Sequence, residues 1–168
     1  MSTDLRFHTS FGIIGIELDH GAAPISSENF LQYARDGHFD GTIFHRVIPG
    51  FVIQGGGFDT KGVQRPTRAP IENEATNGLK NEKYTLSMAR TQAPHSATSQ
   101  FFINVADNAF LDHTAPSPQG WGYAVFGRVV EGTDVVDRIV EVPTGSRGPH
   151  SDWPVEDVVV ERTEVLAD

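Results

Sequence analysis

The chain has 168 residues, of which 38% are hydrophobic and 21% are charged, a composition that indicates one globular domain with a sizeable core. We therefore expect a single domain over residues 1–168. The formal net charge of −9 argues against nucleic acid or an anionic membrane as the main partner, because both require a basic surface. Cysteine is absent, which excludes disulfides, a thiolate nucleophile and cysteine-ligated zinc.

The N-terminal sequence MSTDLRFHTSFGIIGIEL has no basic region followed by a long apolar run. Neither a signal peptide nor a transmembrane segment is therefore expected. A cytoplasmic location is the default expectation, and the lack of cysteine suits a reducing compartment.

Short apolar runs punctuated by glycine and proline predict many strands and few helices. In chain order, the strands are expected over residues 5–10, 11–18, 42–48, 51–55, 84–89, 99–105, 123–130 and 157–165. Long loops are expected between them over residues 56–81 and 106–121. This number of strands, without a repeating strand–helix–strand rhythm, predicts a mainly β fold: an antiparallel barrel or sandwich with helices over its open ends.

Two helices are predicted. The first spans residues 24–37, with Ser26 or Ser27 as its N-cap and Gly37 in the left-handed conformation at its C-terminal end. The second is short and begins at Thr133, which can act as its N-cap.

Several common catalytic patterns are missing from the sequence. None of the seven histidines lies in a metal-binding spacing, so no metal site is predicted. His45 is expected to face away from Arg46 on its strand and to be a hydrogen-bonded structural residue. The segment GGGF (55–58) lacks the lysine and hydroxyl residue of a phosphate-binding loop and indicates a bulge or turn. No G-x-S-x-G elbow supports a serine hydrolase.

Polar side chains inside apolar strands are the remaining candidates, because an unpaired buried guanidinium is costly. Alternation along TIFHRVI (42–48) places Phe44, Arg46 and Ile48 on one strand face. The same reasoning places Val52 and Gln54 on one face of the next strand. It predicts an external wall that brings together Arg46, Gln54, Gln100 and Phe102, with Phe51 at its end. An arginine stacked on a surface phenylalanine would explain this pattern equally well.

Two long segments, FHRVIPGFVIQGGGF (44–58) and LSMARTQAPHSATSQFFINV (86–105), closely resemble the two signatures of the cyclophilins, which are peptidyl-prolyl cis–trans isomerases. NFLQYARDGHFDGTIFHRV and AVFGRVVEG fit the same family in the same order, so the resemblance runs over nearly the whole chain. The form ARTQAPHSATSQFF, with Tyr123 before AVFG, is similar to the bacterial cytoplasmic branch. The resemblance implies a closed eight-stranded antiparallel β-barrel capped by two helices, with its active groove on the outer face.

The family's functional residues can be carried over by motif. The catalytic arginine corresponds to Arg46 and the supporting glutamine to Gln54. The pocket for the proline ring corresponds to Phe51, Val52, Phe102 and Leu111. The rest of the peptide path corresponds to Ala89, Arg90, Thr91, Gln100, Phe110 and Tyr123. The resemblance implies no cofactor, and it implies proline-containing peptides and unfolded or partly folded proteins as partners. A monomer is the default expectation.

Four positions depart from the best-known eukaryotic pattern: Val52 replaces methionine, Arg90 asparagine, Tyr123 histidine and Phe110 tryptophan. The position of Arg90 serves mainly for main-chain pairing with substrate, so that exchange should be tolerated. Phe110 lacks the indole N–H donor. In this family the tryptophan is tied to tight cyclosporin binding, so the resemblance implies weak cyclosporin binding here.

The chemistry of the predicted reaction assigns Arg46 a role. Twisting an X-Pro amide localises the lone pair of the prolyl nitrogen, which can then accept a hydrogen bond from this guanidinium. Two alternatives stay open: a peptide-binding module or chaperone that uses the same groove without catalysis, and a metal-dependent enzyme built from the scattered histidines.

Overall fold

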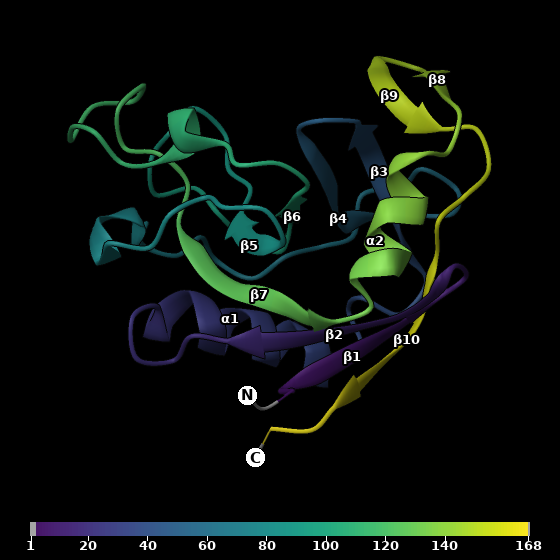
Figure 1. The fold of residues 1–168 in the computed structure, drawn as a ribbon, viewed down its shortest axis with the longest axis horizontal. Coiled ribbons are helices and arrows are strands. Elements are labelled where there is room, and N and C mark those ends of the chain that lie inside the picture. The colour runs from purple at the N-terminus through teal and green to yellow at the C-terminus, as the bar shows by residue number, and fades with distance from the viewer. Residues whose placement is uncertain (1–2, 168) are drawn as a thin grey trace.

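The structure is a computed structural model that describes residues 3–167, and its main element is an eight-stranded sheet. The strands lie in the order β10-β1-β2-β7-β5-β6-β4-β3, and all neighbours are antiparallel (Figure 1). The strands of this sheet are β1 (Leu5–Thr9), β2 (Gly12–Leu18), β3 (Thr42–Ile48), β4 (Val52–Asp59), β5 (Thr85–Met88), β6 (Phe101–Asn104), β7 (Val125–Glu131) and β10 (Val160–Val165).

The two ends of this sheet meet, so that the barrel is nearly closed. The backbone N–H of Gly41 donates to the carbonyl of Val160 at 2.7 Å, just before β3, and the N–H of Phe44 donates to Val158 at 3.0 Å. An isolated bridge pairs Ile43 with Val159 between these two bonds. The predicted eight-stranded barrel is confirmed, and closure leaves few free strand edges.

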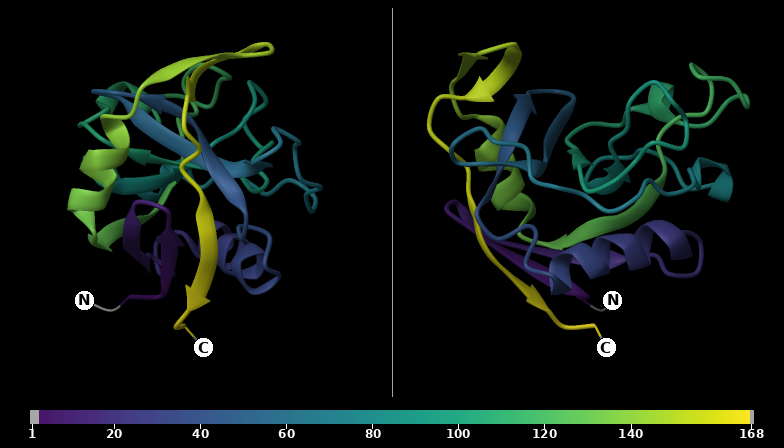
Figure 2. Two further views of the ribbon diagram at one scale, coloured as in Figure 1. Left: turned by 90° about the vertical axis from the view of Figure 1, so that its right-hand side faces the viewer. Right: turned by 180° about the vertical axis from the view of Figure 1, so that it is seen from behind.

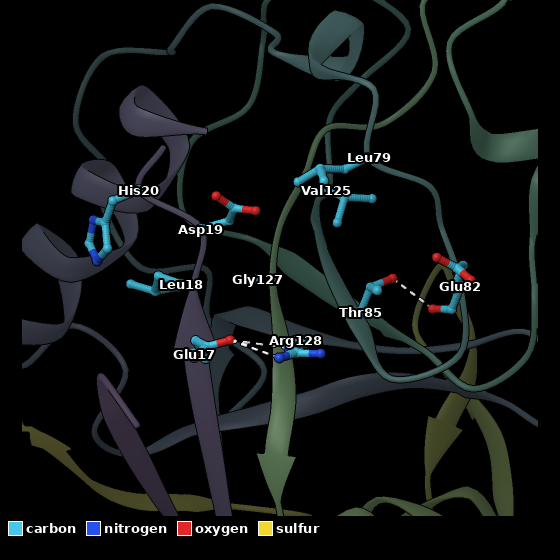
Figure 3. Close-up of a pocket in the computed structure, with 10 residues that line it drawn as sticks. All are labelled: Glu17, Leu18, Asp19, His20, Leu79, Glu82, Thr85, Val125, Gly127 and Arg128. Carbon is cyan, nitrogen blue, oxygen red and sulfur yellow. Dashed lines mark hydrogen bonds and ion pairs between the residues drawn. The ribbon is translucent and has the colours of Figure 1, made fainter. Parts of the chain in front are cut away.

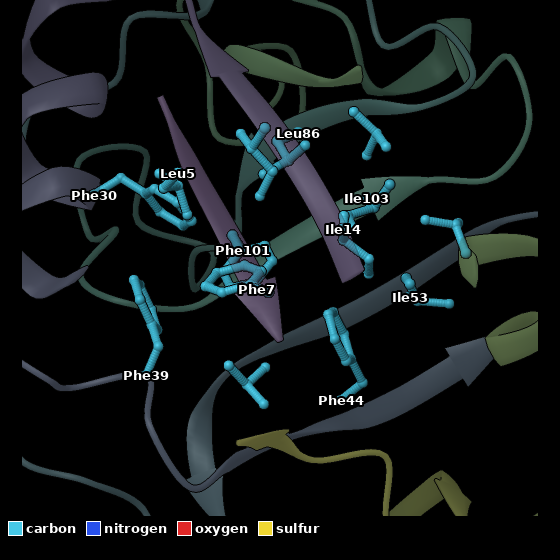
Figure 4. Close-up of a cluster of buried hydrophobic side chains, with 14 of the residues drawn as sticks. Leu5, Phe7, Ile14, Phe30, Phe39, Phe44, Ile53, Leu86, Phe101 and Ile103 are labelled. Atoms are coloured by element: carbon cyan, nitrogen blue, oxygen red, sulfur yellow. The ribbon is translucent and has the colours of Figure 1, made fainter. Parts of the chain in front are cut away.

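Phenylalanine rings fill the centre of the barrel (Figure 4). Phe101 of β6 lies at their middle, with ring centroids at 5.1 Å from Phe30, 5.6 Å from Phe7, 5.7 Å from Phe39 and 6.0 Å from Phe44. All five side chains are at most 1% exposed. Because edge-to-face pairs add to the energy of burial, this cluster is a main source of stability.

Two α-helices pack on the barrel from different sides, α1 (Pro24–Arg35) beside β10 and β7, and α2 (Thr133–Val140) beside β2 and β3 (Figures 1 and 2). Short 3-10 turns lie in the loops, η1 (Ala75–Asn77) and η2 (Ala109–Leu111). Both predicted helices are confirmed.

The predicted N-caps of both helices are wrong. Helix α1 begins at Pro24, so Ser26 and Ser27 lie inside its first turn, where both are buried. The carboxylate of Glu74 caps this end instead, accepting the N–H of Ser26 at 2.7 Å and of Ile25 at 3.2 Å. Proline tolerates the first helical position because its missing N–H would have no intrahelical partner there.

The predicted C-terminal residue of α1 is confirmed, whereas the predicted start of α2 is displaced by one residue. Gly37 follows Asp36, the C-cap of α1, and has φ 74°, as expected for a left-handed C-terminal residue. Thr133 was expected to be the N-cap of α2, but it is the first helical residue. The N-cap is Gly132, which has φ 83°.

The sequence reasoning also missed structure between predicted strands. Strand β4 continues through GGGF to Asp59, and its register with β3 shifts between the Thr42 and Phe44 pairings, so a bulge does fall there.

A separate hairpin is formed by β8 (Thr144–Arg147) and β9 (His150–Pro154). Every residue of β8 is exposed, so the hairpin has no apolar alternation by which a strand can be predicted.

Candidate active site

A β-bulge in β3 aims Arg46 out of the barrel. Phe44 pairs with Gly55 and Arg46 pairs with Gln54, so two steps along β3 match one step along β4. Phe44 and Val47 therefore both belong to the core, while Arg46 is half-buried and lines an external cavity. The expectation that Phe44 and Arg46 share a face is wrong, because an inserted residue interrupts the alternation on which it rested.

His45 is the extra residue in this bulge. Its ring packs against Phe58 at 4.6 Å and Trp153 of β9 at 5.7 Å, outside the core cluster, so His45 and Arg46 both lie outside the core. Within residues 3–167 no group is in hydrogen-bond reach of its Nδ1. It is a structural residue, as expected, but ring packing holds it rather than a hydrogen bond. Burial lowers the pKa of His45 to about 4, and the charges of His150 and Arg46 act in the same direction.

Arg46 borders an external groove between β3–β4 and β6. The groove holds a cavity of about 170 Å³ lined by Arg46, Phe51, Val52, Gln54, Ala89, Arg90, Phe102, Leu111 and Tyr123. Val52, Phe102 and Leu111 form a small buried apolar cluster, separate from the barrel core, which makes the apolar floor of the groove. Such a cavity can hold an apolar ring beside a cation.

Polar side chains extend from Arg46 along the groove wall. Arg46 Nη1 donates to Gln54 Oε1 at 3.3 Å, and Gln54 Nε2 donates to Gln100 Oε1 at 3.0 Å. A Cβ at Gly57 would lie only 2.5 Å from Gln100 Nε2, so glycine makes room for this amide. The guanidinium carbon of Arg46 is 5.9 Å from the Phe51 ring centroid. The predicted wall of arginine, amides and aromatic rings is present.

Two of the expected substrate-binding residues lie at the margin. The Phe110 side chain is 73% exposed and stacks on Phe51 with ring centroids 5.6 Å apart, so it borders the groove without lining its cavity. Thr91 lines a neighbouring cavity of about 450 Å³, which Arg90 and Tyr123 also line. Gly122 allows this part of the chain to pack, because a Cβ there would lie 2.6 Å from the main chain at Asp112.

A buried network of asparagines behind the groove was not anticipated. Asn108 Nδ2 donates to the carbonyl of Phe51 and to Asn104 Oδ1, both at 2.9 Å. Asn104 Nδ2 donates in turn to Asn81 Oδ1 at 3.1 Å, and Asn81 Nδ2 to Asp112 Oδ1 at 2.9 Å. The three asparagines are at most 3% exposed. Asn104 is a polar residue in an otherwise apolar strand, and it was the one feature of the sequence that could have indicated this network.

A larger cavity of about 480 Å³ lies on the outer side of β2, β5 and β7 (Figure 3). Its lining includes the carboxylates of Glu17, Asp19 and Glu82, and Glu17 forms an ion pair with Arg128 at 3.1 Å. Its lining contains no phenylalanine, tyrosine or tryptophan. The groove beside Arg46 is the better candidate for the site despite its smaller volume, because it combines a cation, an amide and aromatic rings.

Two further observations limit what the site can contain. Among residues 3–167, histidine and acidic side chains form no group of three that could hold a metal ion. In the same part of the chain, the helices lack the length and apolar character needed to cross a bilayer.

The barrel and its external groove define a known class of protein. The chain belongs to the cyclophilin type peptidyl-prolyl cis-trans isomerase family, whose model matches residues 4–165. The predicted family, fold and enzyme class are thereby confirmed.

Similar proteins cover almost the full length of the chain. It is 61% identical over 166 residues to peptidyl-prolyl cis-trans isomerase cyp18 of Streptomyces antibioticus, covering 99% of each chain. It is 58% identical over 161 residues to peptidyl-prolyl cis-trans isomerase B of Escherichia coli strain K12, covering 96% of this chain and 98% of the relative.

A solved structure agrees with these matches. A cyclophilin type isomerase of Cryptosporidium parvum, crystallised in the presence of the dipeptide Ala-Pro, superposes with a TM-score of 0.76 at 26% identity. The alignment covers 98% of this chain and 99% of that one.

Proposed function

We propose that this isomerase acts on X-Pro bonds of proline-containing peptides and of unfolded or partly folded proteins, and that Arg46 stabilises the twisted amide nitrogen. The observation that supports this proposal is the position of Arg46, beside an apolar cavity of about 170 Å³. The reaction breaks no covalent bond, so it needs neither a nucleophile nor a cofactor.

The energy that the site must supply can be bounded. Amide rotation has a barrier of ~18–20 kcal/mol, so uncatalysed exchange takes roughly tens to hundreds of seconds. Reaching a millisecond requires about a 10⁵-fold acceleration, or ~7 kcal/mol. One charge-assisted hydrogen bond from Arg46 to the pyramidal nitrogen is worth roughly 1.5–3 kcal/mol. The hydrogen bond alone is therefore insufficient.

The apolar floor of the groove supplies a second contribution. Val52, Phe102 and Leu111 would hold the proline ring, so that the remainder of the substrate rotates against a fixed point. The twisted amide is less polar than the planar amide, and an apolar surrounding favours it. The main chain near Ala89 and Arg90 borders the cavity and would hold the neighbouring substrate residues.

Gln54 has a positioning role in this proposal. Its side-chain oxygen accepts from Arg46 while its nitrogen donates to Gln100, so its amide is oriented by two partners. A fixed acceptor restricts the rotamers of Arg46 and lowers the entropy lost when the guanidinium meets the substrate. Gln54→Ala should therefore reduce kcat more than it raises KM.

Isomerisation of a short Ala-Pro peptide, followed by magnetisation exchange between its cis and trans NMR signals, tests the role of Arg46. Arg46→Ala should lose about 10- to 100-fold in kcat/KM, as expected for one lost charge-assisted hydrogen bond. Arg46→Lys should recover only part, because lysine lacks the planar fork. Equal rates in wild type and Arg46→Ala would refute the mechanism, and retained peptide binding without catalysis in wild type would favour a binding module.

Three further properties belong to the same proposal. The protein would act as a monomer in the cytoplasm, where the absence of cysteine suits a reducing environment. Cyclosporin would bind weakly, since Phe110 has no N–H donor at the groove margin. Light scattering coupled to size-exclusion chromatography tests the monomer, and a dimeric mass at micromolar concentration would contradict it.

A further inference from the structure

The groove continues past Arg90 and Tyr123 into the neighbouring cavity of about 450 Å³. Both residues line both cavities, and the Arg90 guanidinium carbon lies 4.5 Å from the Tyr123 ring centroid. Because the two cavities share these lining residues, they adjoin, so a peptide with its proline beside Val52 would bring its neighbouring residues to the second cavity.

The charge of this second cavity is opposite to that of the whole protein. Its lining consists of Arg90, Thr91, Gln92, Pro118, Gln119 and Tyr123, which include one cation and no carboxylate. The lining of the proline cavity likewise contains arginine and no acidic residue. In a chain of net charge −9, this absence of acidic residues makes the groove a local site for an anion.

Arg90 is held in position but not neutralised. Its Nε donates to the carbonyl of Gly122 at 3.0 Å, and its Nη1 donates to Thr91 at 2.9 Å and to Gln92 at 3.5 Å. Among the described residues these bonds leave the Nη2 group for an incoming acceptor. Within residues 3–167 the arginines that form ion pairs are Arg6, Arg35, Arg68, Arg128 and Arg138.

The acidic residue Glu72 and Arg90 both line a further small cavity. Glu72 forms no ion pair with Arg90. The guanidinium is therefore a fixed cation whose bound partners are carbonyl groups, a state that favours a charge-assisted hydrogen bond with a carboxylate.

We infer that the cavity between Arg90, Gln119 and Tyr123 is a subsite for an acidic side chain within two residues of the substrate proline. The inference rests on the proposed function, which places the proline ring in the neighbouring cavity. It makes Arg90 a specificity-determining residue, so that substrates with glutamate or aspartate near proline are preferred over those with lysine.

The test uses peptides of one length with a single proline and with Glu, Gln or Lys at each of the two positions on either side. Both kcat/KM and the dissociation constant are measured by NMR on the intact protein, without a coupling protease. At one position, Glu should exceed its isostere Gln by about three- to fivefold, as expected for a half-exposed ion pair, and Lys should fall below Gln. The preference should shrink at 0.5 M salt, because exposed charges are screened.

Arg90→Gln should remove the difference between Glu and Gln. Arg128→Gln is the control, because it changes the net charge equally but lies in the cavity of Figure 3. This variant should retain the preference for Glu over Gln. The inference is overturned if no position discriminates Glu from Gln, if the preference persists in Arg90→Gln, or if it is insensitive to salt. Failure of the proposed function looks different: no peptide would exchange faster than without protein, while the dissociation constants would still report on the subsite.

Discussion

The side-chain amide of Asn108 donates a 2.9 Å hydrogen bond to the main-chain carbonyl of Phe51. This contact joins the loop after β6 to the turn between β3 and β4, two segments that both border the groove. The same carbonyl also accepts the N–H of Val105 at 3.0 Å. The position of the Phe51 ring is thus set from behind, by a residue that the substrate never meets.

Asn108→Ala should therefore affect both stability and activity. It removes donors from two buried acceptors, which should lower the free energy of unfolding by about 1–3 kcal/mol in urea denaturation. The loosened turn should also reduce kcat/KM. Asn29→Ala, which removes a 2.8 Å bond to the carbonyl of Thr98, serves as control and should leave activity intact. Full activity in Asn108→Ala would contradict this positioning role.

Phe101 and Phe102 are neighbours on β6 with opposite environments, and truncating each should give opposite results. Phe101→Ala empties the centre of the aromatic cluster and should cost about 3–5 kcal/mol of unfolding free energy. Phe102→Ala widens the groove floor, so it should cost less stability but lose most of the activity. Urea denaturation and NMR exchange rates separate the two effects, and equal losses of stability would contradict the assignment of faces.

His45 makes stability depend on pH. Its pKa is about 4 in the folded protein and near 6.5 in the unfolded chain, so the folded state favours the neutral ring. Its stabilising contribution is complete above pH 6.5 and is lost as pH falls toward 4, by about 3 kcal/mol. In His45→Phe, the fall in unfolding free energy between pH 7 and pH 4 should be smaller than in wild type. Parallel pH profiles of the two proteins would exclude this contribution.

Phe110 allows a test of inhibitor binding. Cyclosporin should inhibit the wild type weakly, and Phe110→Trp should strengthen inhibition by adding an indole N–H at an exposed position beside Phe51. Phe110→Tyr, which adds a hydroxyl donor but no indole N–H, is the control that tests whether the indole itself is required. Nanomolar inhibition of the wild type that Phe110→Trp leaves unchanged would refute the prediction.

Strand alternation was sufficient to find part of the groove, whereas Leu111 of its floor came from the family resemblance. Along β4 and β6 the pattern holds, so Val52, Gln54 and Phe102 lie together as predicted, with Ile53 and Phe101 in the core. On β3 it fails at the bulge, because a single inserted residue depends on pairing with another strand and has no local signal.

Other misses have the same physical origin. The N-terminus of α1 is capped by Glu74, which lies 48 residues from Ser26 in sequence, so no local capping motif could reveal it. The asparagines behind the groove likewise acquire their function from distant partners. Local chemistry predicts an element, whereas its exact start and its supporting contacts arise from the folded surroundings.

The pairing of β1 with β10 has a consequence for synthesis. Leu5 lies opposite Val165, so β1 pairs with a strand that is far from it in sequence and is synthesised much later. On the ribosome, β1 must wait until β10 has emerged before this seam can form. Until then, for roughly 8–30 seconds at a synthesis rate of about 5–20 residues per second, the apolar residues of β1 lack this partner in the nascent polypeptide. During that interval the protein itself benefits from the kind of protection that folding helpers give to others.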